Sequence, residues 1–125
     1  MEKILTTLVL GASAHMERYS YKAVVFLRDH HHPVWAVGRK SGQIQDVPIV
    51  TAISPDWSID TVTLYLNPML QQAYYDSILA LRPRRIIFNP GTENPVFEEK
   101  ARLAGIETQE ACTLVLLQTQ QYDRC

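Results

Sequence analysis

The sequence predicts a single α/β domain whose mostly parallel sheet carries helices on both faces. Short apolar stretches rich in β-branched residues alternate with amphipathic stretches, which is typical of strands and helices that follow one another along a chain. The first apolar stretch lacks the alternation of a half-exposed strand, so we expect it to be covered on both faces. The 125 residues contain no internal repeat or low-complexity linker. We therefore predict one domain over residues 1–125, with a Rossmann-like, doubly wound sheet and a frayed C-terminal end.

The first half of the chain predicts three strands and one helix. The strands are short apolar runs, namely Ile4–Leu10, Pro33–Val37 and Val47–Val50. The segment SYKAVVFLRDH, residues 20–30, lies between the first two and predicts a helix with Ser20 as its N-cap. The stretch 51–60 contains Pro55 and has no helical stripe, so we expect it to be mostly loop.

A strand at Thr61–Leu66 precedes the clearest helix, which we predict over residues 67–83. Asn67 is a suitable N-cap, and Pro68 stands at the first helical position, where its missing N–H costs nothing. The predicted apolar stripe of this helix is Leu70, Ala73, Tyr74, Ser77, Ile78 and Leu81.

The rest of the chain repeats this pattern. After a strand at 84–88, Asn94 and Pro95 start a second helix with Glu98 and Glu99 near its positive end. This helix is expected to stop at Gly105, which suits a left-handed C-terminal cap. The last strand candidates are 106–109 and Cys112–Leu117.

Composition and charge exclude several classes of function. A formal net charge of −1 gives no reason to expect binding to nucleic acid or to a membrane surface. The first apolar run is too short for a secretory signal and far too short to span a bilayer. Of the two cysteines, Cys125 is the last residue, so we expect it and Cys112 to be free thiols in a reducing cytoplasm.

The loop LVLGASAHMER, residues 8–18, is the first candidate for ligand binding. In a doubly wound sheet, ligands bind beyond the carboxyl ends of the strands, and this loop follows the first strand. Gly11 permits an unusual turn, Ala12 keeps it narrow, and Ser13 can donate its hydroxyl to a phosphate oxygen. The fingerprint Gly-x-Gly-x-x-Gly is absent, because Ser13 and Met16 replace its second and third glycines. A compact strand-to-helix turn without a ligand would have the same composition.

The second candidate is the turn VGRKSG after the second strand, with Gly38, Arg39 and Lys40. Enzymes that bind NAD commonly place an acidic residue here to accept the ribose hydroxyls. The two cations instead favour a phosphorylated ribose, which NADP carries at its 2′ position and coenzyme A at its 3′ position. Arg18 adds a third cation on the same edge, and guanidinium groups suit phosphate oxygens. A solvated basic turn is the alternative.

The histidines do not indicate a metal site or a catalytic base. His30, His31 and His32 project in different directions and lie away from the expected crevice, so we interpret them as a polar helix end. His15 is the only histidine near the crevice, and no carboxylate partner for it is evident. Because no nucleophile, zinc or paired-carboxylate motif is evident either, we predict no catalytic residues and no metal.

Taken in order, these motifs resemble a known family. LVLGAS, the basic turn, NP after the fourth strand, NPGTEN after the fifth and a late AC resemble the small single-domain CoA-binding proteins. These are similar to the N-terminal CoA-binding domain of the succinyl-CoA synthetase α subunit. The resemblance implies a binding site for coenzyme A formed by Gly11, Ala12, Ser13, Arg18, Ser20, Gly38, Arg39, Lys40, Asn67, Pro68, Asn89, Gly91, Glu93 and Asn94.

The resemblance also implies roles for these residues. Gly11–Ser13 would hold the pyrophosphate, Arg39 and Lys40 the ribose phosphate, and the pantetheine arm would pass Asn67 and Asn89. The sequence departs from the family where Asn89 replaces a frequent glutamine and is followed by a proline. It departs again at Asp46, where glycine is common. Cys112 matches a recurrent cysteine, which either packs beneath the site or has a chemical role.

The leading hypothesis is binding of coenzyme A or an acyl-CoA without catalysis by this chain alone. The phosphohistidine of the synthetase belongs to a further domain that is absent from this sequence. One alternative is an NADP-dependent oxidoreductase or NADP-binding protein, which predicts a glycine at position 13 and a proton donor. A second alternative is an interaction module with a vestigial crevice, which an exposed patch around Trp57 or Tyr74 would favour.

Overall fold

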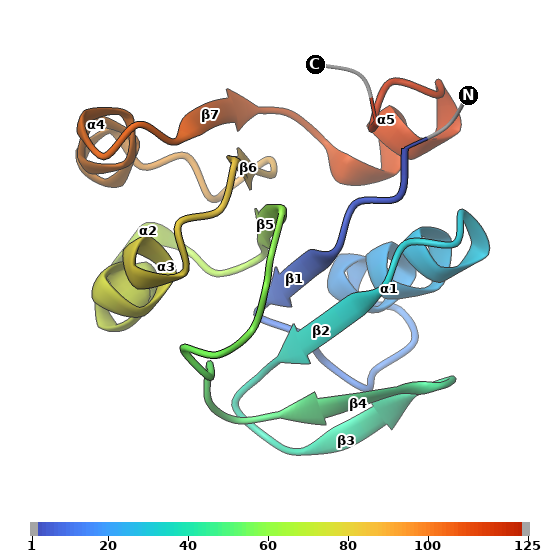
Figure 1. Cartoon of the computed structure of the whole chain (residues 1–125). Coiled ribbons are helices and arrows are strands. Elements are labelled where there is room, and N and C mark those ends of the chain that lie inside the picture. The colour runs from blue at the N-terminus through green and yellow to red at the C-terminus, as the bar shows by residue number, and fades with distance from the viewer. Residues whose placement is uncertain (1–2, 124–125) are drawn as a thin grey trace.

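A computed structural model describes residues 3–123 of the chain (Figure 1). One sheet of seven strands runs through it, in the order β3-β4-β2-β1-β5-β6-β7. The strands are β1 Thr7–Leu10, β2 Val34–Val37, β3 Gly42–Ile44, β4 Val47–Val50, β5 Thr61–Leu64, β6 Arg85–Phe88 and β7 Glu107–Glu110. The helical segments are α1 Tyr19–Asp29, α2 Pro68–Gln71, η1 Gln72–Tyr74, α3 Tyr75–Leu81, α4 Pro95–Leu103 and α5 Thr113–Gln118. The predicted fraying of the last residues, Cys125 included, concerns positions outside the described range.

The order of the strands confirms the predicted fold class. Every neighbouring pair is parallel except β3 and β4, which are antiparallel. The chain winds from β1 outward to β2 and β4, then returns to the other side of β1 and continues through β5, β6 and β7. The strand order therefore reverses between β1 and β5, which is where ligands bind in doubly wound sheets.

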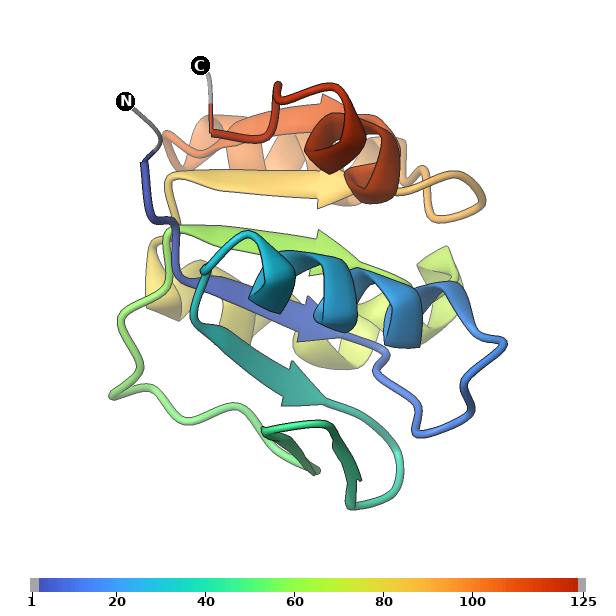
Figure 2. The ribbon, with the colours of Figure 1, turned by 90° about the vertical axis from the view of Figure 1, so that its right-hand side faces the viewer.

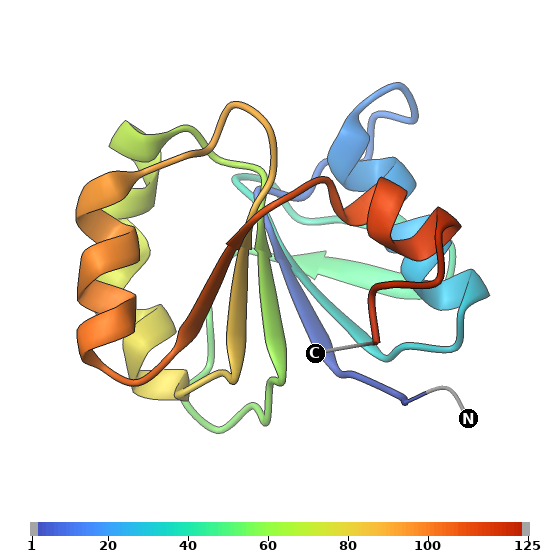
Figure 3. The same ribbon diagram turned by 90° about the horizontal axis from the view of Figure 1, so that it is seen from above.

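Helices cover both faces of the sheet. Figure 3 shows α1 and α5 on one side and α2, α3 and α4 on the other. In β1, Val9 packs into the first of these layers, while Leu8 and Leu10 pack into the second. Because both faces are covered, a strand gains from apolar side chains at every position. This explains why the sequence of β1 shows no alternation.

Strand β3 is an element that the sequence analysis missed. It pairs with β4 through a two-residue turn, Gln45-Asp46, in which Gln45 has a φ of +52°. Turns of this kind are usually signalled by Asn-Gly or Asp-Gly, which are absent here. Asp46 is held by Arg28 of α1, with an N–O distance of 2.8 Å. The hydrogen bond from Arg28 lowers the pKa of the Asp46 carboxyl.

The prediction of a helix over residues 67–83 is confirmed at its start. It is wrong in making this segment one continuous helix. Asn67 caps α2, since its Oδ1 accepts a hydrogen bond from the Leu70 N–H at 3.0 Å. A 3₁₀ turn, η1, then separates α2 from α3. A 3₁₀ turn has fewer residues per turn, so it changes which side chains face the sheet. Gln71 is buried, whereas Leu70 of the predicted stripe is 48% exposed.

Two other local predictions are wrong. Helix α1 begins at Tyr19 with Arg18 at the N-cap, so Ser20 does not cap it. The predicted strand Cys112–Leu117 is the helix α5, in which Thr113, Leu116 and Leu117 are buried. Their spacing of three and four residues is helical, but in so short an apolar run periodicity does not separate a strand from a helix.

The strand termini define two opposite edges of the molecule. Figure 2 shows the arrowheads of the parallel strands directed to one side, where the β1–α1 and β6–α4 loops project. The loops at residues 11–18, 38–41, 65–67 and 89–94 follow β1, β2, β5 and β6. Together these four loops form the carboxyl edge of the sheet. Among residues 3–123, no helix has the length and apolar character needed to cross a bilayer.

Candidate functional site

The loops after β1 and β2 are packed directly against each other. The backbone N–H groups of Gly11 and Ala12 both donate to the Val37 carbonyl, each at 2.9 Å. Gly11 has a φ of +96°, which favours glycine. A Cβ atom on Gly38 would lie only 2.2 Å from the Ala12 carbonyl oxygen. Glycine at position 38 is therefore what allows the basic turn to lie beside the Gly11 turn.

The N-terminus of α1 is left open at this place. No side chain caps it, and its first turn contains no acidic residue. By contrast, Asn67 and Asn94 cap α2 and α4. The first N–H groups of a helix have no partner within the helix and carry a partial positive charge. The open end of α1, next to the Gly11 turn, is thus suited to an anion.

Ser13 and three cations complete this part of the edge. The Ser13 Oγ accepts a hydrogen bond from the His15 N–H at 3.1 Å, which leaves its own hydrogen free to donate. Arg18, Arg39 and Lys40 are exposed, and their side chains form no ion pair with any residue between 3 and 123. An anionic ligand would therefore compete with water alone for these cations.

Asn89 is committed to the protein interior. Its amide nitrogen donates to the Thr63 Oγ1 at 2.7 Å and to the Leu64 carbonyl at 2.8 Å. Its Oδ1 accepts from the Thr113 N–H at 2.9 Å. These bonds use both amide hydrogens and tie the ends of β5 and β6 to the start of α5. The side chain builds the floor of the edge, so a direct contact between it and a pantetheine arm would require these bonds to break.

Asn94 is occupied in a similar way. Its Oδ1 accepts from the Phe97 N–H, and its Nδ2 donates to Gln71 and to the Tyr75 hydroxyl. Of the other predicted residues in this loop, Glu93 accepts a hydrogen bond from the Gly91 N–H at 2.9 Å. The family motif places these residues in one loop of the carboxyl edge, but it did not show which of their side chains face outward.

The remaining predicted residues are placed as follows. Asn67 is exposed and Pro68 half-buried at the start of α2, on the same edge. Ser20 is buried in the first turn of α1, so its side chain faces the core rather than solvent. Cys112 is a half-buried free thiol at the N-cap of α5.

Two residues of the edge escaped the sequence analysis. Gln71 is buried beneath the loops after β5 and β6. Tyr65, directly after β5, has a buried hydroxyl with no hydrogen-bond partner among residues 3–123, and burial raises the pKa of that hydroxyl. Both residues lie within the segment 61–71, which comprises β5, the loop after it and α2. Only the position of that segment, at the predicted reversal of strand order, could have drawn attention to them.

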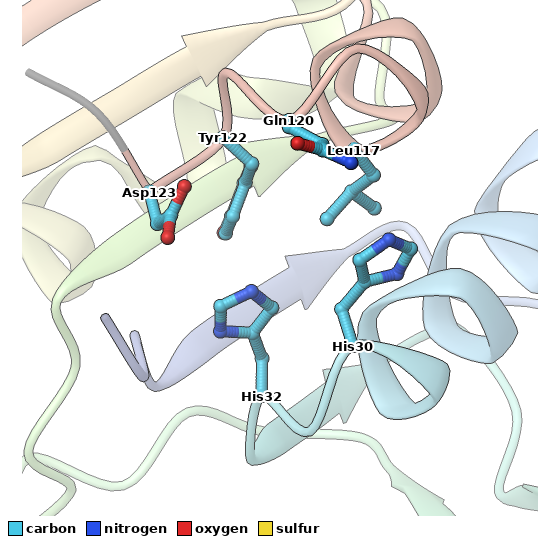
Figure 4. Close-up of a pocket in the computed structure, with 6 residues that line it drawn as sticks. All are labelled: His30, His32, Leu117, Gln120, Tyr122 and Asp123. Carbon is cyan, nitrogen blue, oxygen red and sulfur yellow. The ribbon is translucent and has the colours of Figure 1, made fainter. Parts of the chain in front are cut away.

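The three consecutive histidines lie at the opposite edge, as expected. Figure 4 shows His30 and His32 beside Leu117, Gln120, Tyr122 and Asp123, which together line a small pocket. The interpretation as a polar helix end is wrong for His32, which is only 4% exposed and accepts a hydrogen bond from the Leu5 N–H at 3.0 Å. Within residues 3–123, no group of histidine, cysteine or acidic side chains could hold a metal ion.

The aromatic residues that would mark an interaction surface are partly covered. Trp57 and Tyr74 are half-buried and pack against the core on the α3 side of the sheet. Trp57 also stacks on Trp35, with ring centroids 4.4 Å apart. This packing gives the side chains of Trp57 and Tyr74 a role in the fold.

The fold and this edge define a doubly wound domain whose carboxyl edge has the charge and the open helix N-terminus that suit an anionic ligand. Residues 5–118 match the family described as the CoA binding domain, and the chain therefore belongs to that family. This confirms the resemblance to small CoA-binding proteins, and binding of coenzyme A in general is what the family supports.

Solved structures are similar over nearly the whole chain. The crystal structure of an uncharacterized protein is 43% identical, with a TM-score of 0.92, and the match covers 95% of this chain and 98% of that one. A protein from Thermus thermophilus is 22% identical, with a TM-score of 0.80 and coverage of 94% and 90%. A hypothetical protein from Pyrococcus horikoshii is 20% identical, with a TM-score of 0.84 and coverage of 94% and 84%. The last two likenesses concern the fold alone. No curated protein matches the chain.

Proposed function

We propose that this chain binds coenzyme A or an acyl-CoA along the carboxyl edge, without catalysing a reaction on its own. The observation that carries the proposal is the contact between Gly38 and Ala12. It places the basic turn and the Gly11 turn side by side, within reach of one ligand that bears both a pyrophosphate and a ribose phosphate.

The residues present fit such a ligand. The pyrophosphate would lie at the open N-terminus of α1, where backbone N–H groups and the Ser13 hydroxyl can donate to its oxygens. The 3′-phosphate would meet Arg39 and Lys40, which form no ion pair with a carboxylate within the described residues 3–123. The pantetheine arm would then run toward the loops after β5 and β6.

Two observations support binding without catalysis. The amides of Asn89 and Asn94, which line the far part of the edge, are used in internal hydrogen bonds and have no hydrogen left to offer. His15 is highly exposed, and its nearest carboxylate, on Glu17, is 4.0 Å away and equally exposed. A general base needs a fixed orientation, which an exposed pair of this kind does not supply.

Calorimetric titration with coenzyme A and with dephospho-CoA tests the proposal, because only the former carries the 3′-phosphate. In the double variant Arg39→Glu, Lys40→Glu, we expect the affinity for coenzyme A to fall roughly a hundredfold and that for dephospho-CoA about tenfold or less. A matched control, Lys100→Glu with Arg102→Glu, changes the charge equally on exposed residues of the last turns of α4, and it should affect neither ligand.

Two results would count against the proposal. Equal losses for both ligands would contradict the position assigned to the 3′-phosphate. Tighter binding of NADP than of coenzyme A by the unchanged protein would favour the nicotinamide alternative instead. Titration with acetyl-CoA in the same series shows whether an acyl group is accepted.

A further inference from the structure

A buried glutamine joins two of the loops on the carboxyl edge. Gln71, in the last position of α2, is 0% exposed. Its Nε2 donates to the Leu66 carbonyl and to the Thr92 carbonyl, each at 2.8 Å. Leu66 belongs to the loop after β5, and Thr92 belongs to the loop after β6. One side chain therefore spans the gap between the two loops.

The acceptor end of the same side chain is also used. The Gln71 Oε1 accepts a hydrogen bond from the Asn94 Nδ2 at 2.9 Å, and that nitrogen also donates to the Tyr75 hydroxyl at 2.8 Å. The Asn94 Oδ1 in turn caps α4 through the Phe97 N–H. The network therefore fixes the loop after β5, the loop after β6 and the start of α4 relative to one another.

A glutamine is an unusual residue for this position. Burying an amide costs free energy unless all its hydrogen bonds are made, and a side chain with no polar atoms would avoid the cost. What an apolar side chain could not do is hold two backbone carbonyls from different loops at a fixed spacing. Gln71 therefore contributes a fixed spacing between the two loops rather than the burial of apolar surface.

We propose that Gln71 is a positioning residue for the ligand: it holds the loops after β5 and β6 at the spacing that the pantetheine arm requires, without touching the ligand. This inference rests on the proposed function and extends it. It concerns only the part of the edge beyond the pyrophosphate. The Gly11 turn is held by hydrogen bonds from the Gly11 and Ala12 N–H groups to the Val37 carbonyl, and the basic turn by a hydrogen bond from the Gly38 N–H to the Val50 carbonyl.

The separation between the two parts gives a selective test. Adenosine 3′,5′-bisphosphate carries the nucleotide end of coenzyme A but no pantetheine arm. Gln71→Met keeps the length of the side chain and removes its hydrogen bonds. We expect this variant to bind coenzyme A about tenfold more weakly, and to bind the bisphosphate within twofold of the unchanged protein, by calorimetric titration.

Two control variants separate this effect from a general loss of stability. Gln72→Leu alters the neighbouring exposed glutamine and should leave both affinities unchanged. Ile78→Ala creates a cavity in α3 without removing a hydrogen bond from either loop, so it should lower the melting temperature and leave both affinities unchanged well below that temperature. If Gln71→Met does not fold, Gln71→Leu serves instead, since it also removes both donors and buries no unpaired charge.

A second measurement needs no ligand. Amide hydrogen exchange at residues 89–97, compared with exchange in the core strand β1, should be faster in Gln71→Met than in the unchanged protein. In Ile78→Ala, exchange at residues 89–97 should rise no more than it does in β1. The inference is overturned by unchanged exchange, by equal losses for coenzyme A and the bisphosphate, or by an Ile78→Ala loss that matches the Gln71→Met loss. Failure of the unchanged protein to bind coenzyme A would instead remove the proposed function, and this inference with it.

Discussion

Replacing Gly38 by alanine should damage both the fold and the ligand site. The added Cβ would lie 2.2 Å from the Ala12 carbonyl oxygen, whereas ordinary contacts begin at 3.4 Å. The two backbones would therefore have to separate by about 1 Å to reach an ordinary contact. They cannot do so freely, because Gly38 N–H donates to the Val50 carbonyl at 3.0 Å and Ala12 N–H to the Val37 carbonyl at 2.9 Å.

The size of the effect follows from this constraint. Overpacking of a rigid interior typically costs 1–3 kcal/mol, and here the clashing atom belongs to the backbone, so we expect a loss of about 3 kcal/mol in the free energy of unfolding. For a domain of this length that corresponds to a melting temperature lower by about 10 °C. Urea unfolding followed by circular dichroism gives the free energy directly.

A second glycine of the same region is the matched control. A Cβ on Gly42 would lie 3.4 Å from the Ala14 Cβ and 3.5 Å from the Ile49 Cδ1, which are ordinary contacts. Gly42→Ala should therefore change the free energy of unfolding by less than about 1 kcal/mol. If Gly38→Ala is as stable as Gly42→Ala and binds coenzyme A normally, the close packing of the two turns is not what shapes the site.

Three further variants test other parts of the molecule. Ser13→Asp puts a carboxylate where the pyrophosphate is expected, so calorimetric titration should detect no binding of coenzyme A; normal affinity would place the ligand elsewhere. His31, just after α1, has a φ of +68°, which favours glycine. His31→Gly should therefore raise the free energy of unfolding, measured by urea titration, by about 1 kcal/mol. A loss of stability would show that this backbone conformation is not strained. Burial alone would raise the pKa of Asp60, but hydrogen bonds from Arg84 at 2.9 and 3.1 Å, with a further bond from Thr61, lower it overall. The stabilisation is thus present above the unfolded pKa of about 4 and lost as the pH falls through the lower folded value. Asp60→Asn should therefore be less stable than the unchanged protein at pH 7, and the difference should shrink as the pH falls below about 4. A difference in urea unfolding that stays constant with pH would exclude this linkage.

The sequence was sufficient for the parts of the fold that depend on local chemistry. Asn67 and Asn94 were predicted as helix caps, and both side chains accept the expected hydrogen bonds. The central strands could be recognised because apolar or β-branched residues occupy nearly every position. Once the fold class was predicted, the rule for doubly wound sheets sorted the loops correctly between the two edges, including the three consecutive histidines.

The parts that failed depend on tertiary contacts. The segment Cys112–Leu117 is a helix because Leu116 and Leu117 pack against α1 and the sheet, and no local signal reports that packing. The inward face of residues 67–83 was shifted by a 3₁₀ turn, so Gln71 replaced Leu70 as the buried residue. Polar residues in the family motif pointed to the loop after β6, but a motif does not tell whether an amide such as that of Asn89 faces a ligand or the core.

Mapping the ligand by nuclear magnetic resonance tests the location of the site most directly. Coenzyme A added to the ¹⁵N-labelled protein should shift the amide signals of residues 11–20, 38–41 and 89–94. Signals of residues 30–32 and 117–123, around the pocket at the opposite edge, should stay in place. Shifts concentrated at that pocket, with the Gly11 and Gly38 turns unaffected, would show that coenzyme A does not bind along the carboxyl edge.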